Sequence, residues 1–425
     1  MSHDHSGTTT ERTTNWAGNY TYRAKTIHRP VSIEELQSIV SKAHRIRALG
    51  TGHTFNSIPD SAELISLQGI DPNLTIDREA MTVTVGAGIR YGELGPALHA
   101  EGLALHNTGS LPHICIGGAT ATATHGSGDR NRNLASAVSG IELVTAGGDI
   151  IQARRGDADF PGMVVHLGAL GIATRLTLDV QPTFDACQEV FEDLSWSDLT
   201  TNFDGIFSCA YSVSIFTYYR ETAGVIWVKH RLEDGVVPSS VTRWSATPAR
   251  QDRNPMDGWS SVNCTPQMMV PGPWYQRLPH FRLEDVPASG EEIQSEYMVD
   301  RSRAVDVIAA LRAFEPEMRE FLLVGEIRSI AADDLWLSTA YQRDTVAFHF
   351  SWLIDTNPVE RLLPRLEEML KPFDVRPHWG KAFAATAHDL APRYERLTDF
   401  RQLMSTFDPD GKFRNEFIDQ RVLGA

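Results

Sequence analysis

The stretch Gly50-Thr51-Gly52-His53-Thr54-Phe55-Asn56 sets two glycines and a histidine directly after a short apolar run. Glycine lacks a Cβ and tolerates a positive φ, so consecutive backbone N–H groups in such a loop can converge on an anion such as a pyrophosphate. His53 would then lie beside a bound nucleotide. A plain tight turn with a surface histidine is the more economical explanation of so short a motif alone, so the surrounding sequence has to decide.

The residues on either side of this glycine loop alternate between helical and extended patterns. Ser32 and Glu35 form a capping box, and the apolar stripe that follows predicts a helix over Val31 to His44. Strands are expected at Ile46 to Leu49 and at Leu64 to Leu67. The glycine loop therefore follows a helix–strand unit.

A second glycine pair, Gly86 and Gly88, stands between an alternating strand at Met81 to Val85 and a helical pattern over Tyr91 to Glu101. This order is typical of a dinucleotide-binding βαβ unit. The third glycine, Gly92, comes one position too late, however, and no acidic residue follows about 20 residues later on a second strand. We therefore predict an ordinary strand-to-helix turn.

The least usual composition is found in the runs Gly109 to His113 and Gly117 to Gly128, where nearly every residue is small or hydroxylated. Such a run makes a poor packed element of its own but lets the backbone lie flush along a flat ligand. A flexible linker is less consistent, because apolar residues anchor one end and a strand is expected soon after, at Ser139 to Thr145. A hairpin into Ile150 to Ala153 and a strand at Ala173 to Val180 follow.

After Thr183 the sequence changes character, with most of the tryptophans and several long loops in residues 184–385. Strands are expected at Cys209 to Tyr218 and Gly224 to His230, and helices at Arg303 to Arg312 and Val359 to Leu370. We expect a second α+β domain here, with residues 386–425 returning to helix. A chain of 425 residues is long enough for two hydrophobic cores.

Composition and charge exclude several classes of protein. A formal charge of −15 disfavours a nucleic-acid or anionic-membrane surface, so a bound phosphate would have to be held by backbone. The four cysteines form no CxxC pair, which predicts neither a metal centre nor disulfides and fits a reducing cytoplasm. Residues 1–15 lack the apolar core of a signal peptide, and no run is long enough to span a membrane.

Seven motifs, spread in order over nearly the whole chain, resemble those of the flavoprotein oxidases of the vanillyl-alcohol-oxidase type, and within them the alditol (xylitol) oxidases. They are GTGHTFN at 50–56, VGAGIRYGEL at 85–94, GSLPHI at 109–114, ATHGSG at 123–128, LGALGI at 167–172, GEIRSIAADDLWLS at 325–338 and RPHWGK at 376–381. The resemblance implies an α+β flavoprotein of two domains. Residues 1–183 would form a PCMH-type FAD-binding domain that residues 386–425 rejoin, and residues 184–385 a substrate domain.

By this resemblance the chain binds FAD, and His53 bonds covalently to the flavin 8α-methyl group. A neutral imidazole is a nucleophile near neutral pH, and that methyl is electrophilic in an oxidised flavin. The other residues expected at the cofactor are Gly50, Thr51, Gly52, Thr54, Phe55, Asn56, Ser110, Cys115, Gly118, Thr122, Ala123, Thr124, His125, Ile172 and His378. The glycine loop would then hold the pyrophosphate, as the shortage of basic residues requires.

Oxidising an alcohol by hydride transfer to flavin N5 needs a C–H aimed at the flavin, a group that takes the hydroxyl proton, and positive charge near the reduced ring. Glu326 and Arg328 are two residues apart, as are His349 and Ser351, so on strands each pair faces one side. The resemblance places Glu326, Arg328, Ser351 and Ser110 around the hydroxyls of a polyol. It places His349 and Lys381 nearest the reacting carbon, where one of them accepts or relays the proton. Together with Arg328, these two are the expected catalytic residues.

Two positions depart from the pattern of the alditol oxidases. Gly109 stands where they carry alanine, and the smaller residue should admit oxygen at least as easily, so we expect an oxidase that forms hydrogen peroxide rather than a dehydrogenase. Ser351 replaces a threonine, which keeps the hydroxyl but loosens the expectation about polyol length. The expected reaction is oxidation of the terminal hydroxyl of xylitol or sorbitol to the aldose, by a cytoplasmic monomer.

Two other functions stay open at this point. A sugar-lactone oxidase or dehydrogenase shares the flavin motifs, although residues 325–338 and the HWGK sequence at 378–381 favour alditols. A flavin- or sugar-binding protein without turnover is the alternative from another class, against which His53, His349 and Lys381 together argue. The chain contains neither the GxSxG elbow of a serine hydrolase nor a complete P-loop.

Overall fold

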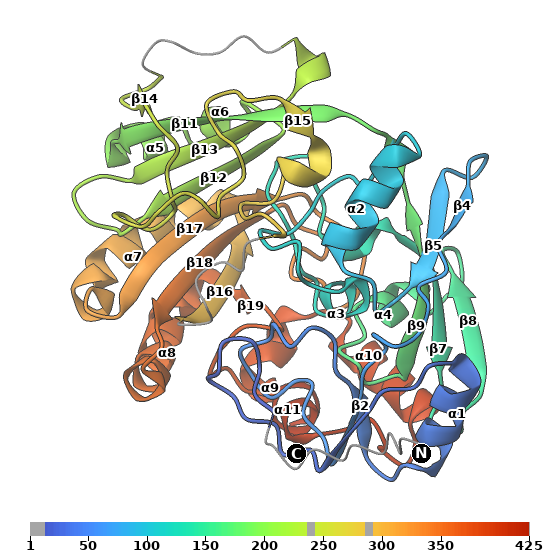
Figure 1. Ribbon diagram of the computed structural model, residues 1–425. Helices are drawn as coiled ribbons and strands as arrows, with labels where there is room; N and C mark the ends of the chain where they lie inside the picture. The colour runs from blue at the N-terminus through green and yellow to red at the C-terminus, as the bar shows by residue number, and fades with distance from the viewer. Residues whose placement is uncertain (1–12, 236–242, 285–291, 425) are drawn as a thin grey trace, which may run out of the picture.

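The computed structural model describes residues 13–235, 243–284 and 292–424, and Figure 1 shows them in two lobes. The N-terminal lobe contains the chain up to Pro182, and the sheet lobe contains most of the residues that follow. Residues 1–12, on which the expectation about a signal peptide largely rests, lie outside the described ranges. Within those ranges, every helix is too short or too polar to traverse a lipid bilayer.

A small parallel sheet begins the N-terminal lobe. Its strands are β1 (Thr26–His28), β2 (Ile46–Ala48) and β3 (Glu63–Ile65), in the order β1-β3-β2, with helix α1 (Ile33–Lys42) beside them. The predicted capping box is only half formed: the Ser32 hydroxyl accepts a hydrogen bond from the Glu35 N–H at 3.2 Å, but the Glu35 carboxylate accepts from the N–H of Val31 rather than from that of Ser32. The elements expected here are confirmed to within two residues at each end. The glycine loop begins where β2 ends.

The second sheet of this lobe has five antiparallel strands in the order β4-β5-β9-β7-β8. Their bounds are β4 Thr75–Asp77, β5 Thr82–Gly86, β7 Val138–Val144, β8 Ile150–Arg154 and β9 Ile172–Asp179. The lobe also holds helices α2 (Tyr91–Ala100) and α4 (Phe160–Val164), and the short strands β6 (Leu103–Ala104) and β10 (Gln181–Pro182), which pair with each other. Strand β9 alternates buried and half-buried residues along its second half, as a strand with one covered face does.

The run of small residues contains a helix, so the expectation that it forms no packed element is wrong for its first half. Helix α3 covers Ile116–Ala121. Glycine allows a close approach here, because a Cβ added to Gly117 would lie 2.9 Å from the Cβ of Ala87 in the turn after β5. The rest of the run, residues 122–128, is turn and extended chain.

A single large sheet organises the sheet lobe. Nine strands form it, eight of them in the order β14-β11-β13-β12-β17-β18-β16-β19, with β15 pairing to β11 beside this path. Their bounds are β11 Asp185–Leu194, β12 Ser212–Thr217, β13 Gly224–Arg231, β14 Thr247–Pro248, β15 Gly272–Pro273, β16 Glu292–Asp300, β17 Leu322–Ile330, β18 Thr345–Leu353 and β19 Arg376–Pro377. The helices of this lobe are α5 (Trp196–Thr201), α6 (Phe203–Phe207), α7 (Ala304–Met318) and α8 (Thr356–Leu370).

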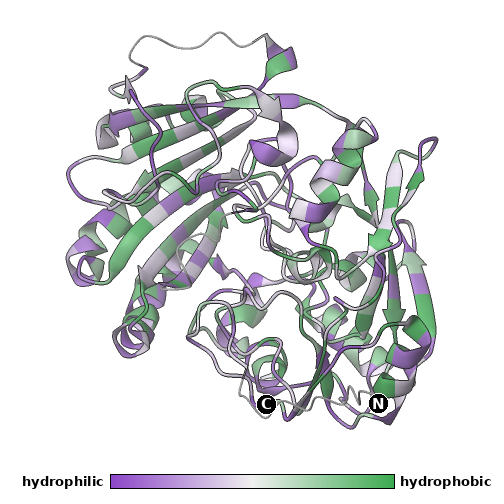
Figure 2. Cartoon of the chain, in the orientation of Figure 1, coloured by the Kyte–Doolittle hydropathy of each residue, from purple (hydrophilic) through white to green (hydrophobic). Residues whose placement is uncertain are grey.

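The central strands of the large sheet are covered on both faces. Figure 1 shows α7 and α8 along the outer face, so the other face is turned toward the N-terminal lobe. Ile327 and Phe348 belong to the same apolar cluster as Leu366 of α8. Figure 2 shows both hydrophilic and hydrophobic residues on α8, whose buried leucines recur at helical spacing while its charged residues are exposed.

The C-terminal segment returns to the N-terminal lobe. It contains α9 (Ala387–Leu390), α10 (Leu397–Phe407) and α11 (Glu416–Ile418). The Asn415 amide donates hydrogen bonds to the carbonyls of Ser57, Ile58 and Asp60 at 2.8 to 3.1 Å. The Lys412 ammonium donates to the carbonyls of Val40 and Ala146, both at 2.7 Å. These bonds join the two ends of the chain into one packed unit.

Candidate active site

A cavity of about 410 Å³ is lined by residues of both lobes. One wall is the glycine loop together with the α3 segment, and the other is the inner face of the large sheet. The long loop between β14 and β15 adds apolar side chains, among them Met256 and Trp259. A concave site with one apolar wall and one polar wall is the usual form of a small-molecule site.

The glycine loop owes its shape to residues without side-chain bulk. Gly52 has a φ of +71°, which favours glycine. A Cβ added to Gly50 would lie 2.6 Å from the sulfur of Cys115, directly before α3. Thr54 Oγ1 is buried and has no hydrogen-bond partner among the residues that the structure describes. A cradle of bare backbone and a buried hydroxyl without a partner fit the dinucleotide part of FAD.

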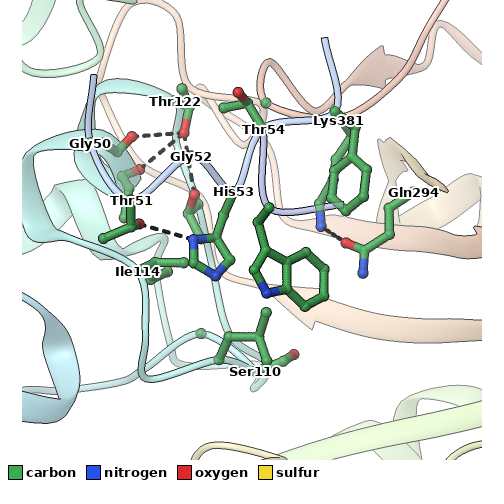
Figure 3. Close-up of a pocket in the computed structure, with 18 of the residues that line it drawn as sticks. Gly50, Thr51, Gly52, His53, Thr54, Ser110, Ile114, Thr122, Gln294 and Lys381 are labelled. Atoms are coloured by element: carbon green, nitrogen blue, oxygen red, sulfur yellow. Dashed lines mark hydrogen bonds between the residues drawn. The ribbon is translucent and has the colours of Figure 1, made fainter. Parts of the chain in front are cut away.

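His53 is held in one orientation inside this loop (Figure 3). Its Nδ1 lies 3.0 Å from Thr51 Oγ1, and its ring stacks on Trp16 with centroids 5.3 Å apart. Burial, with His113 and Lys381 nearby, lowers the pKa of His53 to about 4. The imidazole is therefore neutral at neutral pH, and one of its two nitrogens carries a lone pair that can act as a nucleophile.

The register between strands β17, β18 and β16 brings the side chains of the polar wall together. Glu326 of β17 lies opposite His349 of β18, which in turn lies opposite Glu296 of β16. Arg328 and Ser351 are each two residues further along their strands, so all five side chains share one face, and all line the cavity. The prediction that each pair faces one side is confirmed.

Arg328 lies close to both carboxylates of this wall. Its guanidinium lies 2.5 Å from Glu296 and 3.6 Å from Glu326, and it donates a hydrogen bond to Ser110 Oγ at 3.3 Å. Burial opposes ionisation of both carboxylates, but the Arg328 guanidinium and the neighbouring histidines together outweigh burial and lower the pKa of Glu296 and of Glu326. Burial also opposes the positive charge of Arg328, whose pKa the two carboxylates raise. The wall therefore carries two ionised carboxylates bridged by one arginine.

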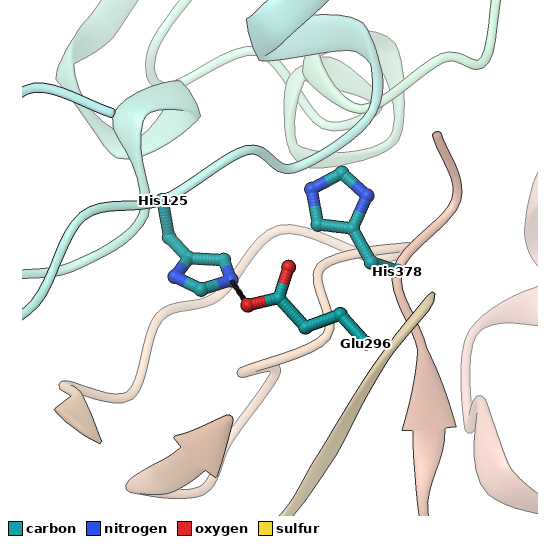
Figure 4. Close-up of side chains that lie close together, drawn as sticks. All are labelled: His125, Glu296 and His378. Atoms are coloured by element: carbon teal, nitrogen blue, oxygen red, sulfur yellow. Dashed lines mark ion pairs between the residues drawn. The ribbon is translucent and has the colours of Figure 1, made fainter. Parts of the chain in front are cut away.

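Glu296 is a site residue that the sequence analysis missed. It is 1% exposed, and its carboxylate lies 3.4 Å from His125 Nε2 and 3.6 Å from His349 Nδ1. Figure 4 shows it between His125, from the N-terminal lobe, and His378. The sequence does show an acidic residue in the extended run 292–300, on the same side of the strand as Gln294. It does not show that this strand, β16, pairs with β18, which brings Glu296 to the site.

His125, Glu296 and His378 also bring possible metal-ligand atoms within 4.8 Å of one another. The same carboxylate already contacts the Arg328 guanidinium, and a second cation there would be repelled by that charge. We therefore interpret the trio as a polar cluster in the cavity wall rather than as a metal site.

Lys381 enters the cavity from the loop after β19. Its ammonium donates to Gln294 Oε1 and lies 5.1 Å from the centre of the Phe55 ring. Burial lowers the pKa of Lys381, and the charge of Glu296 opposes that effect. Gln294, like Glu296, was not predicted; it fixes the ammonium from β16.

Three of the residues expected at the cofactor lie behind the cavity wall rather than in it. Asn56 donates hydrogen bonds to the carbonyls of Trp379 and Lys381 and so ties the glycine loop to the segment carrying Lys381. Ala123 is fully buried, and Ile172 lies in a separate apolar cluster, where its neighbour Ala173 lines the cavity instead. The remaining expected residues line the cavity: Gly50, Thr51, Gly52, His53, Thr54, Phe55, Ser110, Cys115, Gly118, Thr122, Thr124, His125, Glu326, Arg328, His349, Ser351, His378 and Lys381.

Comparison with known proteins identifies the family. Residues 24–154 match the FAD binding domain family, and residues 290–421 match the D-arabinono-1,4-lactone oxidase family. An alditol oxidase from a Streptomyces species is 45% identical over 95% of this chain and 97% of its own length. The chain belongs to the alditol oxidase family of FAD-dependent oxidoreductases. An L-gulono-1,4-lactone dehydrogenase from Mycobacterium tuberculosis is 30% identical over 96% of this chain and 98% of its own length.

Solved structures confirm the fold expected for this family. Cholesterol oxidase from Brevibacterium sterolicum superposes with a TM-score of 0.78 at 15% identity, over 96% of both chains. At that identity the likeness concerns the fold alone. The predicted two-domain α+β flavoprotein, with a PCMH-type FAD-binding domain, is confirmed, and residues 50–54 of the matched FAD binding domain line the cavity between the lobes.

Proposed function

We propose that this chain oxidises the terminal hydroxyl of polyols such as xylitol and sorbitol to the aldose, with O2 as electron acceptor and hydrogen peroxide as product. The observation that carries the proposal is that Glu326, Arg328 and Ser351 of the polar wall lie in one cavity with Ser110 of the loop before α3 and with the glycine loop. The 45% identity to an alditol oxidase over nearly the full length of both chains supports the same substrate class.

The polar wall suits a chain of hydroxyl groups. A hydroxyl both donates and accepts hydrogen bonds, so it needs acceptors and donors side by side. Glu326 supplies carboxylate acceptors, Arg328 supplies fixed N–H donors, and the hydroxyls of Ser110 and Ser351 supply either. Because the donors and acceptors lie on adjacent strands and one loop, their spacing is rigid.

His349 or Lys381 accepts or relays the proton of the substrate hydroxyl, since the family resemblance places these two residues nearest the reacting carbon. FAD, when bound, supplies the hydride acceptor. His349 Nε2 lies 3.3 Å from Ser351 Oγ, and its Nδ1 lies 3.6 Å from the Glu296 carboxylate. Lys381, with a pKa lowered by burial, can share its proton or stabilise a developing alkoxide. Arg328 adds fixed positive charge to the same space.

We propose that His53 bonds covalently to the flavin 8α carbon. The neutral state of its imidazole and the contact of Nδ1 with Thr51, which leaves the other nitrogen available, support this bond. We also propose oxidase behaviour, since Gly109 leaves the cavity wall without a methyl group beside Ser110. Burial and hydrogen bonding around the cavity are compatible with both proposals.

The remaining expectations stay proposals of the same kind. We propose that residues 1–183 and 386–425 form the FAD-binding domain, with residues 184–385 as the substrate domain. All four cysteines are free, three of them buried, which supports a cytoplasmic location. We further propose that the enzyme is monomeric.

The test is a peroxide assay with the purified holoprotein and a panel of xylitol, sorbitol and L-gulono-1,4-lactone. We expect peroxide from the two polyols and little from the lactone. Turnover of the lactone alone would support the alternative of a sugar-lactone oxidase or dehydrogenase, with which the lactone dehydrogenase relative and the lactone oxidase family agree. If the protein binds FAD but oxidises none of the three compounds, the result would support a flavin- or sugar-binding protein without turnover.

A further inference from the structure

A buried chain of side chains lies behind Glu326 that no motif of the sequence marks. His280 Nε2 lies 2.9 Å from Glu326 Oε1, and both side chains are almost wholly buried. The His280 ring is packed edge-on against Phe216 and Trp227, with centroids 5.5 and 5.2 Å away. The ring therefore has little freedom to turn away from the carboxylate.

Lys229 stands on the far side of the same imidazole. Its side chain comes from β13 and is 1% exposed. The ammonium donates to the carbonyls of Leu278 and Pro279, at 2.5 and 2.9 Å, and to His280 Nδ1 at 3.1 Å. An ammonium has three N–H donors, and three acceptors meet it here. While Lys229 is protonated, Nδ1 accepts, so the proton of the neutral ring is carried by Nε2 and donated to Glu326.

The backbone of the same segment reaches the opposite side of the substrate wall. The His280 N–H donates to the carbonyl of Ser110 at 3.0 Å. His280 thus holds two residues of the polar wall at once, Ser110 through its backbone and Glu326 through its ring. Burial, with Lys229 nearby, lowers the pKa of His280 to about 4, so the ring is neutral at neutral pH. Burial also lowers the pKa of Lys229 to about 7, so the ammonium that faces Nδ1 is fully present only below that pH.

We propose that the Lys229–His280 pair is a positioning device that fixes the Glu326 carboxylate for substrate hydroxyls and so sets the affinity for polyols. Both His280 and Arg328 contact Oε1 of Glu326, which leaves Oε2 as the oxygen that accepts from substrate. Without the His280 donor, the carboxylate is free to swing onto Arg328 in a bidentate pair, which would withdraw both groups from the substrate. This inference rests on the proposed function, in which Glu326 binds the polyol.

The test compares His280→Gln with His280→Asn in the FAD-loaded enzyme. Glutamine places an amide donor near the position of Nε2 and reaches Glu326, whereas asparagine keeps an acceptor near Lys229 but is too short. We expect the asparagine variant to raise the KM for xylitol about tenfold, the value of one hydrogen bond to a charged group, with kcat within about twofold of wild type. The glutamine variant should restore most of the affinity. Lys229→Met should raise KM as well, since the tautomer of His280 is then no longer fixed.

Repeating the His280→Asn substitution in a Glu326→Gln background tests whether its effect depends on the contact between His280 and Glu326. There the asparagine substitution should change KM by less than about twofold, because the charged acceptor is already gone. Equal KM values for the glutamine and asparagine variants, or a fall in kcat alone, would overturn the positioning role. Loss of flavin or of folding in the asparagine variant, with a normal glutamine variant, would mean that the segment is structural and would also overturn it. A wild-type enzyme that turns over no polyol would instead refute the proposed function.

Discussion

Replacing Glu296 by glutamine removes one negative charge from the cavity wall and keeps the size of the side chain. Glu296 is 1% exposed, and its carboxylate lies 2.5 Å from Arg328. Removing one partner of a buried ion pair costs about 3–5 kcal/mol, because the other charge is left uncompensated. Arg328 keeps Glu326 at 3.6 Å, so we expect the lower end of that range, a loss of about 3 kcal/mol in unfolding free energy at neutral pH.

The pH dependence of this loss follows from the lowered pKa of Glu296. Burial raises that pKa, but Arg328 and His125 outweigh burial and hold it well below 4.5. As the pH falls, the unfolded chain binds the proton first, near a pKa of about 4.3, and the stability contributed by the ionised carboxylate is lost. The stability difference between wild type and Glu296→Gln should be constant above about pH 5 and should narrow by up to about 1.4 kcal/mol per unit below about pH 4.

Denaturant unfolding followed by tryptophan fluorescence measures both effects in the holoprotein. Glu101→Gln is a matched control, because Glu101 pairs with Arg78 at 2.6 Å but its side chain is 51% exposed. The control should lose less than about 1 kcal/mol. A Glu296→Gln variant as stable as wild type at neutral pH, or a stability difference that stays constant in acid, would refute the electrostatic account of the wall.

Three further substitutions test the proposed chemistry. His53→Ala should still bind FAD but release all yellow colour to the supernatant on acid precipitation, whereas wild type keeps it in the pellet; colour released from wild type would remove the covalent bond. His349→Ala should slow anaerobic flavin reduction by xylitol about 10²–10⁴-fold if His349 is the base, and an unchanged rate would leave that role to Lys381. Gly109→Ala adds a methyl group that would meet Ile114 Cδ1 at 3.4 Å and Thr124 Cγ2 at 3.7 Å, so the fold should tolerate it. The reoxidation of the reduced flavin by air should become slower, and a faster reoxidation would contradict the role given to Gly109.

Local patterns in the sequence predicted the local features of the fold. The N-cap at Ser32 and the alternation along β9 depend on neighbours a few residues away, and both are present. The same holds for the pairs of the polar wall, because the period of a strand alone puts Glu326 and Arg328 on one face. Helix α3 was missed because its stability comes from close packing against the turn after β5, which propensity does not report.

The residues missed at the site depend on contacts between distant parts of the chain. Glu296 and Gln294 reach the cavity because β16 pairs with β18, which follows it by some 50 residues of sequence with β17 in between. His280 and Lys229 meet only because a loop segment packs on β13. No motif marks such residues, since each is an ordinary polar residue until the sheet order is known. The resemblance to the alditol oxidases supplied the residues that are expected to contact ligand, and the structure supplied the residues packed behind them.

Anaerobic mixing of the purified enzyme with xylitol shows whether a polyol reduces the flavin. We expect the yellow flavin colour to bleach, and readmitted air to restore it with one hydrogen peroxide formed per flavin reoxidised. A flavin that stays oxidised in the presence of xylitol and sorbitol but bleaches with a sugar lactone would contradict the claim that this chain oxidises polyols.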